Sequence, residues 1–78
     1  MPGSSDKWAG HAKRHLKAEL KRAGINYAEL ARRLTEMELP ETEGSVTVKI
    51  NRGAFPAWFL FAVMRAIGAH TLRVEDWS

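Results

Sequence analysis

The first third of the chain carries apolar residues at helical spacing. Between about Lys7 and Ala23 an apolar residue returns every three or four positions, and a helix of about 3.6 residues per turn places these positions on one face. Gly24 follows and provides the left-handed residue with which many helices end. The pattern therefore predicts an amphipathic helix over residues 7–23. Its apolar stripe consists of Trp8, Ala12, Leu16, Leu20 and Ala23.

A second helix is predicted from Asn26. Asn26 and Glu29 have the spacing of a capping box, with asparagine in place of the usual serine or threonine. The dipeptide Leu39-Pro40 ends the run, because a residue before proline avoids the helical conformation. We expect Tyr27 in this helix, together with Trp8 in the first, to anchor the core. The apolar stripe of the second helix consists of Tyr27, Leu30, Ala31, Leu34 and Met37.

Residues 45–51 are ambiguous from their pattern. They alternate between apolar and polar side chains, which is typical of a strand. The same residues also suit a helix that is capped by Thr42 or Ser45 and directs Val46 and Ile50 toward the core. β-Branched residues lower helix propensity only slightly, and tertiary packing overrides a difference of that size. The pattern alone leaves both alternatives open.

The most apolar stretch predicts a further helix, which begins near Pro56 and ends at Ile67, before Gly68. Residues 57–64 are apolar almost all round, as in a helix that is buried on every side. A chain of this length can hardly surround such a helix, so we expect one face to contact a second copy. Beyond it, residues 71–74 alternate again and predict a short edge strand or an extended tail. The expected dimer interface consists of Trp58, Phe59, Phe61, Met64 and Leu72.

Length and composition limit the class of protein. With 78 residues the chain forms one small domain, predicted over residues 7–74, between a disordered leader (1–6) and a tail (75–78). Its longest strongly apolar run is far shorter than the roughly 20 residues of a membrane-spanning helix. Cysteine is absent, which excludes disulfides and fits a cytoplasmic location. The net charge of +3 admits a nucleic-acid partner without requiring one.

Three short motifs lie in or at the ends of the predicted elements. Leu30-Ala31 lies in the second, Asn51-Arg52-Gly53 ends the third, and Ala66-Ile67-Gly68 ends the fourth. With a short turn before the second helix, this outline resembles the Cro/lambda-repressor-like (XRE-type) helix-turn-helix domain. A Leu-Ala pair and a Glu-Arg-Gly motif take the corresponding places in that superfamily. The resemblance implies an all-α, four-helix fold and favours a helix for the ambiguous segment.

More closely, the chain resembles a family of short, uncharacterised bacterial proteins, to which such a domain is assigned without an established function. One departure from a compact helix-turn-helix is an enlarged connection over residues 35–44, which holds four glutamates. Their carboxylates would repel DNA phosphates, although acidic residues also stabilise a helix N-terminus. The resemblance covers most of residues 8–74. It is carried by Leu16-Lys17-Ala18-Glu19-Leu20-Lys21-Arg22, Tyr27-Ala28-Glu29-Leu30-Ala31, Glu41-Thr42-Glu43, Lys49-Ile50-Asn51-Arg52-Gly53 and Ala66-Ile67-Gly68.

The resemblance implies double-stranded DNA as partner, with the third helix in the major groove and the second helix near the phosphates. No acidic residue occurs from Gly44 to Val74, which suits such a surface. Asn51 has an alternative role, in which it bonds carbonyls at the helix end. We therefore expect a homodimeric transcriptional regulator; the alternative is a protein-interaction module, an adaptor or antitoxin-like inhibitor, that keeps the fold without reading DNA. The residues predicted to bind DNA are Ser45, Thr47, Lys49, Asn51, Arg52, Arg32 and Arg33.

Other chemistry has less support in the sequence. His11, His15 and Glu19 have a spacing that suits zinc, but no fourth ligand accompanies them, and such a row is more typical of a solvated helix side. Neither a cysteine nucleophile nor a glycine-rich phosphate loop is present, so we predict neither an enzyme nor a cofactor. The polar face of the first helix is expected to be solvated. Its cations are Lys7, Arg14, Lys17 and Lys21.

Overall fold

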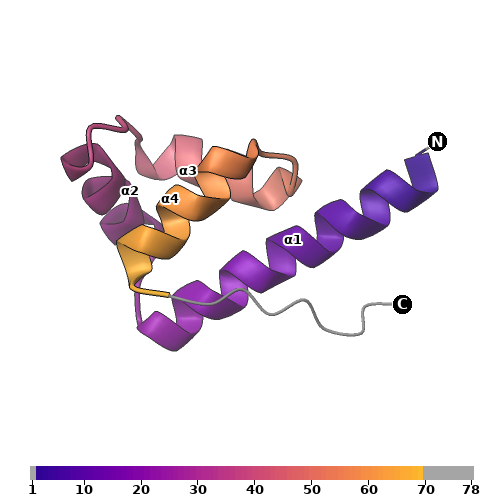
Figure 1. Cartoon of the computed structure of the whole chain (residues 1–78), viewed down its shortest axis with the longest axis horizontal. Coiled ribbons are helices and arrows are strands. Elements are labelled where there is room, and N and C mark those ends of the chain that lie inside the picture. Colours follow the sequence, from indigo (N-terminus) through magenta and orange to yellow (C-terminus); the bar gives the residue numbers. More distant parts are fainter. Residues whose placement is uncertain (1, 70–78) are drawn as a thin grey trace.

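The structure is a computed structural model in which residues 2–69 are described, with side chains from Ser5 onward. It contains α1 (Pro2–Ala23), α2 (Tyr27–Glu36), α3 (Glu43–Arg52) and α4 (Ala57–Ile67), and no strand among these residues. The predicted all-α, four-helix fold is thereby confirmed for this part of the chain. Figure 1 shows α1 as one long helix, with the other three gathered over its C-terminal part. The segment 71–74 and the tail 75–78 lie outside the described residues.

Helix α1 is longer than its apolar stripe predicts. It begins at Pro2, because proline is well tolerated in a first helical turn. Residues 2–6, for which the sequence predicts a disordered leader, are the first residues of this helix in the structure. The N-terminal turns extend past the other helices (Figure 1), and Trp8 is 51% exposed. The prediction that Trp8 anchors the core is wrong: its ring lies outside the buried cluster and packs edge-on against His11 of the same helix, with the ring centres 5.2 Å apart.

Helix α2 begins where its capping signal predicts. The Asn26 side chain accepts a hydrogen bond from the backbone N–H of Glu29 at 2.8 Å, which is the N-cap half of a capping box. The helix ends at Glu36, earlier than Leu39-Pro40 requires, and Met37 at its C-cap is exposed rather than part of the buried stripe. The buried residues of α2 are Leu30, Ala31 and Leu34.

The ambiguous segment is a helix, α3, so the strand alternative is excluded. Thr42 caps it: the Thr42 hydroxyl accepts from the Ser45 N–H at 3.1 Å, and the Ser45 hydroxyl accepts from the Thr42 N–H at 2.9 Å. This pair of bonds satisfies donors that a helix start otherwise leaves unpaired. Val46 and Ile50 are fully buried, while Val48 between them faces solvent. Burial therefore follows the helical period and not the alternation of the sequence.

Gly53 ends α3 and joins it to α1. It adopts a left-handed conformation with φ +64°, which glycine alone adopts without strain. Its Cα packs so closely on α1 that a Cβ there would lie 2.0 Å from the carbonyl oxygen of Ala9. The C-terminal end of α3 is therefore fixed against the N-terminal half of α1.

The core lies where α3 and α4 each pack against both α1 and α2. Helix α4 ends at Ile67, followed by Gly68 with φ +76°, as its sequence predicts. Tyr27 is half-buried and packs on the core, so its predicted role is met only in part. The buried cluster consists of Leu16, Leu20, Leu30, Ala31, Leu34, Val46, Ile50, Phe59, Ala62 and Val63.

Candidate nucleic-acid interface

The arginines of α2 are held by carboxylates of their own helix. Arg32 bonds Glu29 at 2.6 Å and Glu36 at 2.8 Å, and Arg33 bonds Glu29 at 2.8 Å. Hydrogen bonds from Arg32 and then Arg33 lower the pKa of Glu29 to about 2, and Glu29 in turn raises the pKa of Arg32. Both guanidinium groups are thus already balanced by negative charge within the chain.

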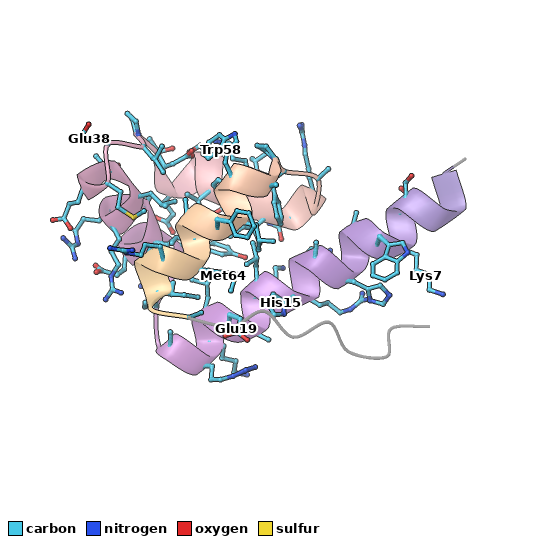
Figure 2. The ribbon with its side chains drawn as sticks, in the orientation of Figure 1. Lys7, His15, Glu19, Glu38, Trp58 and Met64 are labelled. Carbon is cyan, nitrogen blue, oxygen red and sulfur yellow. The ribbon has the colours of Figure 1, made fainter. Side chains whose placement is uncertain are left out.

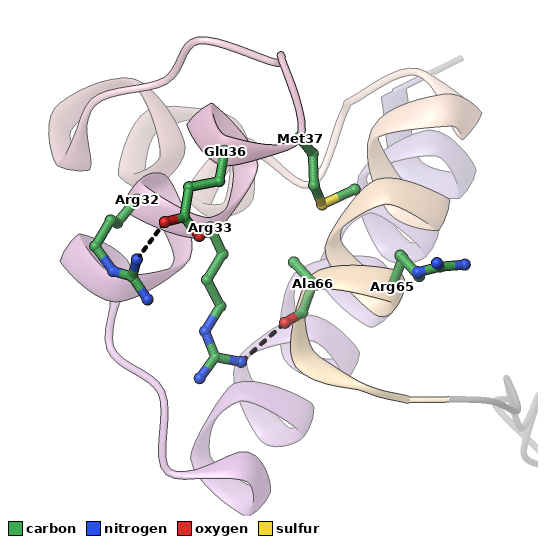
Figure 3. A pocket seen from close by; sticks show the side chains of 6 residues that line it. All are labelled: Arg32, Arg33, Glu36, Met37, Arg65 and Ala66. Atoms are coloured by element: carbon green, nitrogen blue, oxygen red, sulfur yellow. Dashed lines mark hydrogen bonds and ion pairs between the residues drawn. The ribbon is translucent and has the colours of Figure 1, made fainter.

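Arg33 also has a structural role. It donates a hydrogen bond of 2.9 Å to the backbone carbonyl of Ala66, near the C-terminal end of α4. Figure 3 shows this bond beside an open hollow between α2 and α4, with Arg65 extending from the other side of α4, away from the ion-paired arginines. This bond ties α2 to α4, and a cation near the C-terminal end of a helix also stabilises that helix. The hollow is lined by Arg32, Arg33, Glu36, Met37, Arg65 and Ala66.

Lys49 of α3 is paired with the carboxylate of Glu41 in the α2–α3 connection. Its ammonium lies 2.5 Å from Glu41, whose side chain is only 6% exposed and also accepts a hydrogen bond from the Ser45 hydroxyl. Burial alone would raise the pKa of Glu41, but the bonds from Lys49 and Ser45 outweigh it and lower the pKa. The same ammonium lies 5.3 Å from the centre of the Phe59 ring, within cation–π range. Lys49 therefore links the α2–α3 connection to α3 and α4.

The hydroxyl residues of α3 bond the backbone of their own helix. Ser45 forms the capping box with Thr42, and the Thr47 hydroxyl donates to the carbonyl of Glu43 at 2.7 Å. Both side chains are half-buried. Their hydroxyl groups therefore support the first turns of α3.

Asn51 and Arg52 are the predicted DNA-binding residues that remain exposed without a hydrogen bond or ion pair among the described residues. The carbonyl of Ile50 is bonded by the Gly53 N–H, so the helix end is closed by the backbone rather than by Asn51. Since Gly53 packs on Ala9, Arg52 lies beside the N-terminal half of α1.

The exposed cations of α1 form a second basic surface, here called the α1 basic face: Lys7, Arg14, Lys17 and Lys21. Within residues 5–69 none of the four forms an ion pair, whereas Arg22 on another side of α1 pairs with Glu19 at 3.3 Å. The Arg14 guanidinium contacts the His11 ring at 3.1 Å. Burial, followed by the charges of Arg14 and Lys7, lowers the pKa of His11. Positive charge is thus concentrated along this face.

The sequence contains a signal that separates the two kinds of cation. Carboxylates three or four positions away pair with cations on a helix. Arg22, Arg32 and Arg33 each have such a glutamate, and each is ion-paired in the structure. No cation of the α1 basic face has one, nor does Arg52. The spacing of glutamates therefore identifies the cations that are paired within one helix, although it misses Lys49, which pairs with Glu41 eight residues away.

Only part of the predicted dimer interface is exposed in the structure. Trp58 and Phe61 of α4 are 52% and 65% exposed, whereas Phe59 and Met64 are buried within the chain. Phe59 is part of the core cluster and is not available to a partner in this fold. Leu72 lies outside the described residues.

Two further features are absent from the residues that the structure describes. In this part of the chain, His, Cys, Asp and Glu side chains nowhere gather in a group of three that would hold a metal ion. Among the same residues, no helix is both long enough and apolar enough to cross a bilayer.

Comparison with known proteins identifies the family. Residues 8–72 match the family described as Domain of unknown function (DUF6471), which covers most of the chain, so the protein belongs to that family. No curated protein and no solved structure matches the chain.

Proposed function

We propose that this protein binds double-stranded DNA through the α1 basic face together with Arg52. The observation that carries the proposal is the distribution of ion pairs. The cations of α2 and Lys49 are balanced by glutamates, whereas those of the α1 basic face and Arg52 are not, among the described residues. The proposal keeps the partner that the sequence predicts and assigns the contact to a different set of side chains.

Exposed cations of this kind suit a polyanion. Each lysine or arginine that neutralises a phosphate releases condensed counterions, which favours binding at low salt. Lysines 17 and 21 lie one helical turn apart, and Arg14 and Lys7 continue the row toward the N-terminus. Such a row suits a phosphate backbone, and the C-terminal end of α3 carries side chains of the types that read base edges, asparagine for adenine and arginine for guanine.

The N-terminal end of α3 is less suited to DNA. Glu38 in the connection before α3 and Glu43 in its first turn are exposed and would repel phosphates. The C-terminal end carries Asn51 and Arg52 and lies against α1. We therefore propose that the C-terminal end of α3, rather than its N-terminal end, approaches the duplex.

Binding to a random-sequence duplex, followed by fluorescence anisotropy over a salt series, tests the proposal. The decisive comparison is between the double variants Lys17→Ala/Lys21→Ala and Arg22→Ala/Arg32→Ala. Each removes two positive charges, but only the second removes cations that are ion-paired within the chain. We expect the salt dependence of the first to be shallower by about 2 in the slope of log K against log salt, since each phosphate contact contributes about 0.9.

The control variant is expected to keep the wild-type slope. Equal effects of the two double variants would show that only net charge matters and would overturn the assigned surface. No binding by the wild-type protein at low salt would overturn the proposal itself and would favour the alternative, a protein-interaction module.

A further inference from the structure

The outer face of α4 carries aromatic side chains that the described part of the chain leaves exposed. Trp58, Phe61 and Arg65 follow one another at spacings of three and four residues, so they lie in one row along the helix. Figure 2 shows Trp58 on α4, away from α1. Trp58 touches the core only at its edge, where its ring lies 6.1 Å from that of Phe59. Exposed aromatic rows of this kind mark interaction surfaces.

We propose that this row, here called the α4 row, binds the α4 row of a second copy, with the two helices antiparallel about a two-fold axis close to Phe61. The row has an aromatic ring at its beginning, an aromatic ring in its middle and a cation at its end. An antiparallel two-fold places the beginning of one row against the end of the other. Trp58 of each copy then faces Arg65 of the other, and the two Phe61 rings meet at the centre.

Charge favours a second copy in this orientation. Helix α4 contains no acidic residue, and Arg65 forms no ion pair among the described residues. A tryptophan face is the best aromatic partner for an arginine, and the antiparallel pairing provides this contact twice. A parallel pairing would instead bring the two Arg65 side chains together. In the antiparallel pairing the two Arg65 side chains lie at opposite ends of the paired rows, seven residues or about 10 Å apart along the helix axis.

The expected dimer is weak. One helix face with two exposed rings lies at the small end of specific interfaces, so we expect a dissociation constant on the order of 10 μM. The inference does not depend on DNA binding, because the α4 row shares no residue with the α1 basic face or Arg52.

Sedimentation of the full chain between about 1 and about 500 μM brackets such a constant and tests the inference. We expect the wild-type protein to shift from monomer to dimer over this range. Phe61→Glu should remain monomeric, and Val48→Glu, an equally apolar-to-acidic change on the exposed face of α3, should dimerise as the wild type does. Both replaced side chains are exposed, so the helical circular dichroism should be unchanged. A wild-type monomer at every concentration, or a dimer of Phe61→Glu, would overturn the inference.

A second set of variants tests the antiparallel pairing. Trp58→Arg places arginine against arginine and should weaken the dimer at least tenfold. The double variant Trp58→Arg/Arg65→Trp restores a tryptophan opposite an arginine and should recover most of the affinity. A double variant that is as weak as Trp58→Arg would contradict the antiparallel contact.

Discussion

Among the glycines of the described chain, Gly53 is the one at which an added Cβ would meet the backbone of another helix. Three glycines of the described chain follow a helix with positive φ, namely Gly24, Gly53 and Gly68. Gly24 and Gly68 have nothing within 4 Å of an added Cβ, whereas at Gly53 the Cβ would meet the backbone of Ala9. The left-handed conformation is common to all three positions. A difference in stability between alanine variants at Gly53 and at Gly68 therefore reports the contact between α3 and α1.

Gly53→Ala is expected to destabilise the protein by more than about 2 kcal/mol, because a left-handed conformation costs a non-glycine residue about 1–2 kcal/mol and the contact with α1 must also open. Gly68→Ala should cost only the conformational part, about 1 kcal/mol. Urea unfolding of both variants gives the two values. Equal losses would contradict the close approach of α3 and α1.

Glu29 provides a pH-dependent test of the α2 ion pairs. Its pKa is lowered from 4.5 to about 2 by Arg32 and Arg33, so the folded state holds the charged form more strongly than the unfolded state does. The stabilisation is present above pH 4.5 and is lost as the pH falls toward 2. Glu29→Gln should therefore be less stable than the wild type at pH 7, and the difference should shrink by pH 2 in urea unfolding. A difference that is constant from pH 7 to pH 2 would argue against the pairs.

Among the elements, α3 shows most clearly what a local pattern predicts and what it misses. Its alternation of apolar and polar residues favours a strand, yet its capping box and the glycine at its end are helix signals. In the structure Val46 and Ile50 are buried and Val48 is exposed, as the helical period requires, whereas a strand would place all three side chains on one face. The connection before α3 contains Glu38 with φ +66°, a left-handed residue that no sequence pattern indicates.

Thr42→Ala tests the cap of α3. Removing an N-cap hydroxyl costs about 1 kcal/mol of stability, since a backbone donor loses its partner. Thr47→Ala is the matched control on the same helix: its hydroxyl bonds a carbonyl that is already part of the helix, so its loss should cost less than about 0.5 kcal/mol. Thermal unfolding of both variants provides the comparison, and a larger loss for Thr47→Ala would contradict the assigned cap.

For the molecule as a whole, helix order and most helix ends were predictable because caps, glycines and apolar stripes are local signals. The exposure of Trp8 was not, since an apolar stripe does not show which of its positions the neighbouring helices cover. In the candidate site, too, ion pairs within one helix were predictable and an ion pair between elements was not. The pairs of Arg32 and Arg33 follow helical spacing, but the pair between Lys49 and Glu41 crosses the α2–α3 connection and depends on tertiary packing. Local spacing therefore identified only part of the cations that the fold neutralises.

The surface that meets DNA is tested most directly by nuclear magnetic resonance. Adding a random-sequence duplex to the isotope-labelled protein, and following the backbone amide shifts, shows which face is contacted. We expect changes concentrated at residues 7–21 of α1 and at Asn51 and Arg52, with little change at residues 32–38. Changes concentrated at residues 32–38 and 43–49 would contradict it, because they would place the duplex on the side where glutamates already neutralise the cations.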